Sequence, residues 1–295
     1  MPVTTANSVS IAYEQHGATD GEHLVLIQGL GMPLTAWPQD FIDYFVGLGM
    51  RVTVFDNRDI GQSQMMSGPG KVGFLYQLIK SQLGLSVTSP YSLNDMAEDT
   101  ASLMDALGIE SAHIVGISMG GMIAQLLAIE HGERVRSLTA IMSTSAEKGL
   151  PGPTKEVSRQ LLSRPESAEM ADRIAFGVKT WRLIGSKAFP RDQAELEDFL
   201  RRNYERGSPA PGIMRQMLAI AAAPDRVSKL KSLTIPTLVL HGENDPLVPV
   251  ECGRSIAGAV PDAKIRTFPG MGHDLPRQLL PELLQEISAH QRQLV

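Results

Sequence analysis

Cysteine is almost missing from this sequence, in which Cys252 is the single example among 295 residues. One thiol cannot form an intramolecular disulfide or a thiolate metal cluster, so packing must hold the fold together, and a reducing compartment is expected. Basic residues are not in excess either, because 27 Lys and Arg stand against 32 Asp and Glu, for a net charge of -5. This balance excludes a duplex-DNA binder, which needs a basic face to displace counterions from phosphates.

Long apolar runs are also missing. The most apolar stretch, residues 119–129, contains two glycines and Gln125. It is far shorter than the roughly 18 residues that a membrane-spanning helix needs. Residues 1–15 have neither the basic residues nor the apolar run of a signal peptide. We therefore expect a cytoplasmic protein without a membrane span.

What the sequence does contain is an alternation of short β-rich runs with segments of helical spacing, which is typical of a mostly parallel sheet covered by helices. With 43% apolar residues the chain can form a core. Strands are predicted at residues 23–29, 51–57, 111–117, 135–142, 234–242 and 263–270, with an antiparallel edge strand at 9–15. Helices are predicted at residues 38–48, 92–107, 119–131, 250–260 and 276–293.

Two stretches break this alternation. Residues 67–90 are too long for a simple connection and are expected to form a short helix. Residues 143–231 are poor in strands and have helical runs, which lie at 156–162, 168–181, 193–201 and 212–222. We predict an α/β fold in which residues 1–142 and 232–295 form the core domain and residues 143–231 form an inserted helical cap.

The candidate nucleophile is Ser118, in the centre of residues 116–120 (GISMG). This G-x-S-x-G pattern ends a predicted strand and begins a predicted helix, which is the context that a nucleophile elbow requires. Small flanking residues let strand and helix approach each other while the serine takes a strained backbone conformation. A capping serine in an ordinary glycine-rich turn is the alternative.

A serine hydroxyl needs a base, and the base needs an orienting acid. His273 lies in a glycine-rich loop directly after the last predicted strand, and Asp245 follows the strand before it. Glu243 is the nearest competitor for the acid, while Asp274 would have to fold back onto its neighbour. The order Ser118, Asp245, His273 is the order of α/β-hydrolases. Among the other histidines, His241 is expected to support its loop and His290 to be solvated.

Acyl transfer also needs donors for the oxyanion. One is expected from the backbone N–H of Met119, the residue after the nucleophile. The second is expected from the N–H of Leu30, in a glycine-rich loop after the strand at residues 23–29. A plain loop made by Gly29 and Gly31 is the alternative.

At these residues the chain resembles the α/β-hydrolase superfamily. Residues 56–63 (DNRDIGQS), 116–120 and 269–276 (PGMGHDLP) are especially similar to aclacinomycin methylesterase-like carboxylesterases. The resemblance implies a serine esterase with a helical cap and a pocket between cap and sheet. It further implies a triad and an oxyanion hole, whose residues are Ser118, Asp245, His273, Leu30 and Met119. The chain departs from many members in carrying Gln28 where they have histidine.

Other motifs are assigned structural roles. Residues 68–73 fit G-x-G-x-x-G but follow no buried strand, so a dinucleotide site is not expected. Asp56, Arg58 and Asp59 are expected to form a turn held by charge-assisted hydrogen bonds. One helix face is acidic and is expected to be solvated rather than metal-binding. Its residues are Asp95, Glu98, Asp99 and Asp105.

The sequence thus predicts a carboxylic-ester hydrolase for small to medium esters, with no metal or organic cofactor. Its partner is a small-molecule ester rather than a nucleic acid, and the oligomeric state stays open, a homodimer included. The triad does not distinguish ester hydrolysis from lactone, thioester or carbon–carbon bond hydrolysis, acyl transfer or perhydrolysis. A ligand receptor with the hydrolase shape but no turnover is the alternative from another class.

Overall fold

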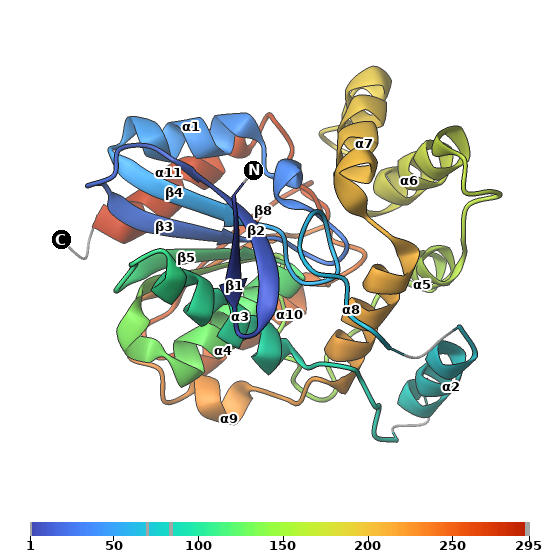
Figure 1. Cartoon of the computed structure of the whole chain (residues 1–295), viewed down its shortest axis with the longest axis horizontal. Coiled ribbons are helices and arrows are strands. Elements are labelled where there is room, and N and C mark those ends of the chain that lie inside the picture. Colours follow the sequence, from blue (N-terminus) through green and yellow to red (C-terminus); the bar gives the residue numbers. More distant parts are fainter. Residues whose placement is uncertain (1, 69–70, 83–84, 293–295) are drawn as a thin grey trace.

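The computed structural model describes residues 2–68, 71–82 and 85–292, which form an eight-stranded sheet (Figure 1). The strand order is β1-β2-β4-β3-β5-β6-β7-β8. β1 and β2 are antiparallel to their neighbours, and the strands from β4 to β8 run parallel. The strands are β1 (Val3–Ala6), β2 (Val9–His16), β3 (Glu22–Ile27), β4 (Met50–Phe55), β5 (Ala112–Ile117), β6 (Val135–Ile141), β7 (Thr237–Gly242) and β8 (Lys264–Phe268). The carboxyl ends of β3, β5, β7 and β8 therefore meet at one edge.

Helices cover both faces of the sheet, which explains why the residues of its central strands are mostly apolar and buried. One face packs against α1 (Gln39–Gly47) and α11 (Leu280–Arg292). The other packs against α3 (Leu93–Ala106), α4 (Met119–Glu130) and α10 (Val250–Ala259). The predicted α/β fold is confirmed, and each predicted core strand and helix is present with its ends shifted by a few residues.

The chain between β6 and β7 contains α5 (Lys155–Leu162), α6 (Met170–Ile184), α7 (Gln193–Gly207), α8 (Ala210–Ala222) and the short α9 (Val227–Leu230). The α5–α8 segment (residues 155–222) lies to one side of the sheet in Figure 1, next to α2 (Lys71–Gln82). Prediction missed β1, α9, and the short helices η1 (Leu34–Ala36) and η2 (Gly132–Arg134). The predicted segments 67–90, 68–73 and 276–293 lie partly outside the described residues.

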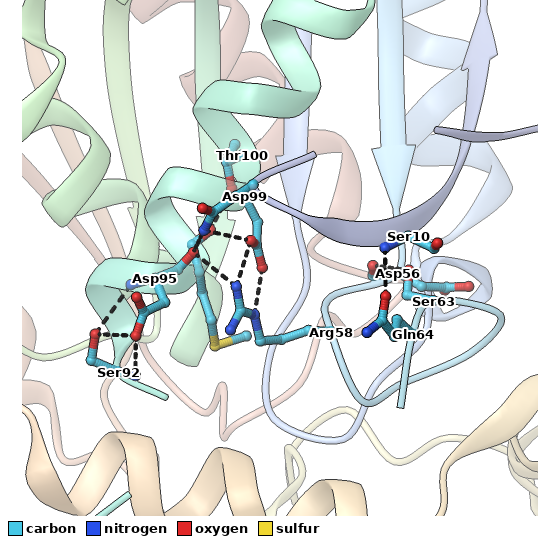
Figure 2. A network of polar contacts seen from close by, with 11 residues as sticks. Ser10, Asp56, Arg58, Ser63, Gln64, Ser92, Asp95, Asp99 and Thr100 are labelled. Carbon is cyan, nitrogen blue, oxygen red and sulfur yellow. Dashed lines mark hydrogen bonds and ion pairs between the residues drawn. The ribbon is translucent and has the colours of Figure 1, made fainter. Parts of the chain in front are cut away.

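The predicted sequence signals for both ends of α3 are confirmed. Ser92 caps α3, since its Oγ accepts from the Asp95 N–H at 3.1 Å and the Asp95 carboxylate accepts from the Ser92 N–H at 2.7 Å (Figure 2). A cap of this kind stabilises a helix by about 1 kcal/mol. Gly108 follows the helix with a φ of 67°, a left-handed conformation that favours glycine. No helix in the described parts of the chain is long and apolar enough to cross a membrane.

Two expectations about exposure are wrong. Asp99, on the acidic face of α3, is buried and receives two hydrogen bonds of 2.6 Å from Arg58, which reaches it from the turn after β4 (Figure 2). His290 is buried as well, because α11 packs against the sheet, and its Nε2 lies 3.2 Å from the Pro236 carbonyl. Helical spacing alone does not reveal partners that come from distant elements.

The turn after β4 is held by buried ion pairs. The Asp56 carboxylate binds Arg206 of α7 at 2.7 Å, and the Asp59 carboxylate binds Arg215 of α8 at 2.6 Å. Together with Arg58 and its partner Asp99, these pairs confirm the predicted structural role of the turn. They also join the core to the α5–α8 segment.

Candidate active site

Ser118 stands between β5 and α4 in a strained backbone conformation, with φ 55° and ψ -118°. Such a conformation costs a non-glycine residue roughly 1–3 kcal/mol. The neighbouring glycines are required by close packing. A Cβ on Gly120 would lie 2.0 Å from the Ile27 carbonyl oxygen, and one on Gly116 would lie 2.2 Å from the Gly120 carbonyl oxygen. The sharp turn lifts the hydroxyl above the carboxyl end of β5, as expected for a nucleophile elbow.

The structure brings the three predicted catalytic side chains together. His273 Nε2 lies 3.0 Å from Ser118 Oγ, and His273 Nδ1 lies 2.6 Å from Asp245 Oδ2. An ionised carboxylate can only accept, so Nδ1 carries the proton and Nε2 is left to accept from the serine hydroxyl. Asp245 Oδ1 accepts from the N–H groups of Leu247 and Val248 at 2.9 and 2.8 Å. These two bonds fix the carboxylate beneath the imidazole.

The other acids and the second histidine of this region make their hydrogen bonds elsewhere, although His241 Nε2 also lies 3.6 Å from Asp245 Oδ2. Asp274 bonds to the α5–α8 segment, where its Oδ1 accepts from Ser186 N at 3.0 Å. Burial raises the pKa of Asp274. His241 Nε2 donates to the Val248 carbonyl at 2.7 Å, which supports the loop as expected. Burial lowers the pKa of His241, which disfavours the charged form of its ring. Glu243 accepts from the Thr267 hydroxyl instead.

Of the two predicted backbone donors, Met119 directly follows the serine, and Leu30 follows Gly29, which packs against the serine. Met119 is the first residue of α4, where the N–H groups of the first turn have no partner within the helix. Leu30 lies in the β3 loop (residues 28–34), and a Cβ on Gly29 of that loop would lie 3.2 Å from Ser118 Cβ. Across the described ranges, neither the Leu30 nor the Met119 N–H has a protein acceptor. Neither donor is therefore occupied by another residue of the described ranges.

Several contacts that sequence reasoning missed fix the loops around the site. His273 N–H donates to the Ile184 carbonyl at 2.7 Å, and Gly272 N–H donates to Ser186 Oγ at 2.8 Å. Ile184 and Ser186 belong to the α5–α8 segment, so this segment holds the His273 loop (residues 269–276). Ser143 Oγ donates to the Ser118 carbonyl at 2.9 Å. These residues have no motif of their own, and only the folded chain brings them to the site.

A pocket of about 210 Å³ lies beside the His273 loop. Its wall includes Trp181, Ser186, Arg191 and Asp274, but neither Ser118 nor His273. The pocket is therefore separate from the Ser118–His273 pair. No group of three or more His, Cys, Asp or Glu side chains in the described ranges could hold a metal ion.

A family model described as the alpha/beta hydrolase fold matches residues 22–276. The chain belongs to the α/β-hydrolase family. Among curated relatives, rhodomycin D methylesterase DnrP of Streptomyces peucetius is 26% identical over 310 residues, covering 98% of this chain and 97% of that protein. The putative carbamate hydrolase RutD of Variovorax paradoxus is 26% identical over 263 residues, covering 88% of each chain.

Solved structures agree on the fold of this α/β-hydrolase. The enol-lactonase of Burkholderia xenovorans superposes with a TM-score of 0.76 at 18% identity, covering 98% of this chain and 99% of that chain. The resemblance to methylesterase-like proteins seen in the sequence is confirmed by the curated relatives. The family and these relatives support a hydrolase.

Proposed function

We propose that this α/β-hydrolase is a serine carboxylesterase in which Ser118 is the nucleophile, His273 the general base and Asp245 the orienting acid. The observation that carries the proposal is the hydrogen-bonded chain from Ser118 Oγ to His273 Nε2, 3.0 Å, and from His273 Nδ1 to Asp245 Oδ2, 2.6 Å. A chain of this kind is what converts a weak hydroxyl into a nucleophile.

In the proposed first half-reaction, Ser118 Oγ attacks the ester carbonyl carbon while its proton passes to His273 Nε2. Collapse of the tetrahedral intermediate breaks the bond to the alcohol oxygen, which takes the proton from His273 and leaves. In the second half, His273 takes a proton from water as the water oxygen attacks the acyl-serine. The acid is then released, and the proton returns to Ser118 Oγ.

We propose that the Leu30 and Met119 N–H groups bind the oxyanion of both tetrahedral intermediates. Support comes from the packing of Gly29, the residue before Leu30, against Ser118, and from the lack of a protein acceptor for either N–H in the described ranges. Met119 also begins α4, whose amino-terminal end favours negative charge. Donors oriented in advance stabilise the charge as it forms without having to reorganise.

We further propose that residues 143–231 act as a cap domain over a core of residues 1–142 and 232–295. The α5–α8 segment contacts both the His273 loop and the turn after β4, which supports this division. A pocket between cap and core would take a small to medium ester. The methylesterase relatives favour a carboxylic ester, whereas RutD, named as a putative carbamate hydrolase, favours a carbamate.

The test compares wild type with Ser118→Ala on p-nitrophenyl esters of increasing acyl length, beside a lactone, a thioester and a carbamate. Loss of the nucleophile should lower kcat on the order of 10⁴-fold or more. Ser232→Ala is the matched control. Ser232 is exposed, and its hydroxyl donates to the carbonyl of Lys229 in the neighbouring helix α9. If Ser118→Ala keeps the wild-type rate, the proposal is wrong. A preference for another substrate would reassign the reaction but keep the nucleophile.

A further inference from the structure

One residue of the β3 loop, Gly31, is hydrogen-bonded to the α5–α8 segment through both its N–H and its carbonyl. Gly31 N–H donates to Gln216 Oε1 at 2.9 Å, and the Gly31 carbonyl accepts from Ser208 Oγ at 2.9 Å. Gln216 lies on α8, and Ser208 lies between α7 and α8. Both side chains are buried, Gln216 completely. Burying a polar side chain costs free energy unless its hydrogen bonds are made. The hydrogen bonds to Gly31 therefore hold these two side chains in position.

The orientation of the Gln216 amide is set from its other end. Gln216 Nε2 donates to the Arg58 carbonyl at 3.0 Å, so a flipped amide would place its NH₂ against the Gly31 N–H and its oxygen against the Arg58 carbonyl. The side chain thereby bridges the β3 loop and the turn after β4. Gly31 also packs against α8, because a Cβ there would lie 3.1 Å from Ile213 Cγ1.

Helix α8, which carries Gln216, is anchored to the core by the preceding residue, Arg215. Arg215 makes two hydrogen bonds to Asp59, of 2.6 and 2.9 Å. Asp56, which binds Arg206, also accepts from the Leu34 N–H at 2.7 Å, at the far end of the β3 loop. α8 therefore cannot shift without breaking buried charged bonds, and the point at which it holds the loop is rigid.

The β3 loop needs such an anchor because Leu30 stands between two glycines. Gly31 has a φ of 71°, and glycine populates both signs of φ, so the loop has many alternative conformations. We propose that Gln216 is a positioning residue: with Ser208 it fixes the two peptide groups on either side of Gly31 so that the preceding Leu30 N–H faces the reacting oxygen. This inference rests on the proposed function, and it makes α8 part of the catalytic apparatus without contact to substrate.

A donor that bonds the oxyanion acts mainly in the transition state, so its misplacement should lower kcat more than it changes KM. Removing one such donor outright costs about 10²–10³-fold in kcat, and a loosened donor should cost less, about 10- to 100-fold. A residue that merely stabilises the fold would lower the amount of folded enzyme and leave kcat per active site unchanged.

The experiment replaces Gln216 by Met, which keeps the length and removes both hydrogen bonds. Gln160→Met is the matched control, because Gln160 is also buried in the α5–α8 segment but bonds only within it, to Thr180 Oγ1 at 2.9 Å. Active sites are counted by labelling with a fluorophosphonate, and kcat and KM are measured on p-nitrophenyl acetate. Gln216→Met should lose about 10- to 100-fold in kcat with KM changed by less than about threefold. Gln160→Met should stay within about twofold of wild type.

A second readout does not depend on activity. Amide hydrogen exchange over residues 28–34 should be faster in Gln216→Met than in wild type and Gln160→Met, since Gly31 N–H loses its acceptor. If Gln216→Met does not fold, Ser208→Ala replaces it in both measurements, because it removes the hydroxyl that donates to the Gly31 carbonyl and so loosens the other side of the same residue.

The outcomes separate the two proposals. Faster loop exchange with a lower kcat supports the positioning role. Unchanged exchange, or faster exchange with kcat unchanged, overturns it. If wild type hydrolyses no ester, the proposed function fails instead, and the exchange comparison by itself decides whether Gln216 holds the loop.

Discussion

The ion pair between Arg215 and Asp59 allows a sharp prediction about how the α5–α8 segment is attached. Both side chains are buried, at 9% and 0% exposure, and the contact is bidentate, at 2.6 and 2.9 Å. Asp59 also accepts from the Tyr91 hydroxyl and from the Met66 N–H, each at 2.7 Å. In Arg215→Met the carboxylate would keep these two neutral donors but lose its only charged partner among these contacts.

Leaving one partner of a buried pair without its countercharge costs about 3–5 kcal/mol. Arg202→Met is the matched control, since Arg202 of α7 pairs with Asp198 where both side chains are more than half exposed. Such a pair contributes about 0–1 kcal/mol. A second change, Asp59→Asn, removes the unpaired charge, so the double variant Asp59→Asn, Arg215→Met should recover part of the stability that Arg215→Met loses.

Urea unfolding measures these differences. Trp181 lies in α6 and Trp37 beside α1, so variants with a single tryptophan report on the segment and on the core separately. Coincident transitions would support treating the unfolding as two-state. If Arg215→Met loses no more stability than Arg202→Met, or if Asp59→Asn gives no recovery, the reasoning about buried charge is refuted.

Three further predictions follow from the geometry. Gly120→Ala should disrupt folding, because its Cβ would lie 2.0 Å from the carbonyl oxygen of a β3 residue. In Gly258→Ala on α10 the new Cβ meets nothing within 4 Å, so this control should raise the unfolding free energy by about 0.5–1 kcal/mol. Thermal unfolding compares the two variants. Burial lowers the pKa of His113, so the unfolded state binds its proton first, and stability should fall as pH drops below about 6.5. His113→Gln should flatten this slope by up to about 1.4 kcal/mol per pH unit in urea titrations, and an unchanged slope would contradict it. Asp245→Asn should lower kcat on the order of 10⁴-fold by favouring the wrong tautomer of His273, and a loss under tenfold in an ester assay would count against the proposed acid.

The fold was predictable because its signals are local. Buried parallel strands are short apolar runs, and the helices between them carry their own ends, such as the capping box at Ser92 and the glycine at residue 108. β1 was missed because it has only four residues and only one of them is buried. Its sequence therefore shows no alternation of apolar and polar residues. The helical insertion was visible as a gap in the alternation, while its role as a cap stays a proposal.

The site was predictable only in part. Ser118, Asp245 and His273 each follow a predicted strand, and parallel strands bring their carboxyl ends to one edge, so their meeting could be expected. Gln216 could not be foreseen in the same way. It is a single polar residue in a helix, and its partner Gly31 lies 185 positions away.

The sequence was enough to determine the α/β class, through its composition, its apolar periodicity and its short motifs. It also selected the candidate nucleophile, base and acid, because residues that follow parallel strands lie at the same edge of the sheet. Tertiary structure alone decided which buried charges pair, that Asp99 and His290 are enclosed, and that α8 holds the β3 loop. Those contacts join elements far apart in the chain. Their free energy comes from desolvated partners that no local pattern records.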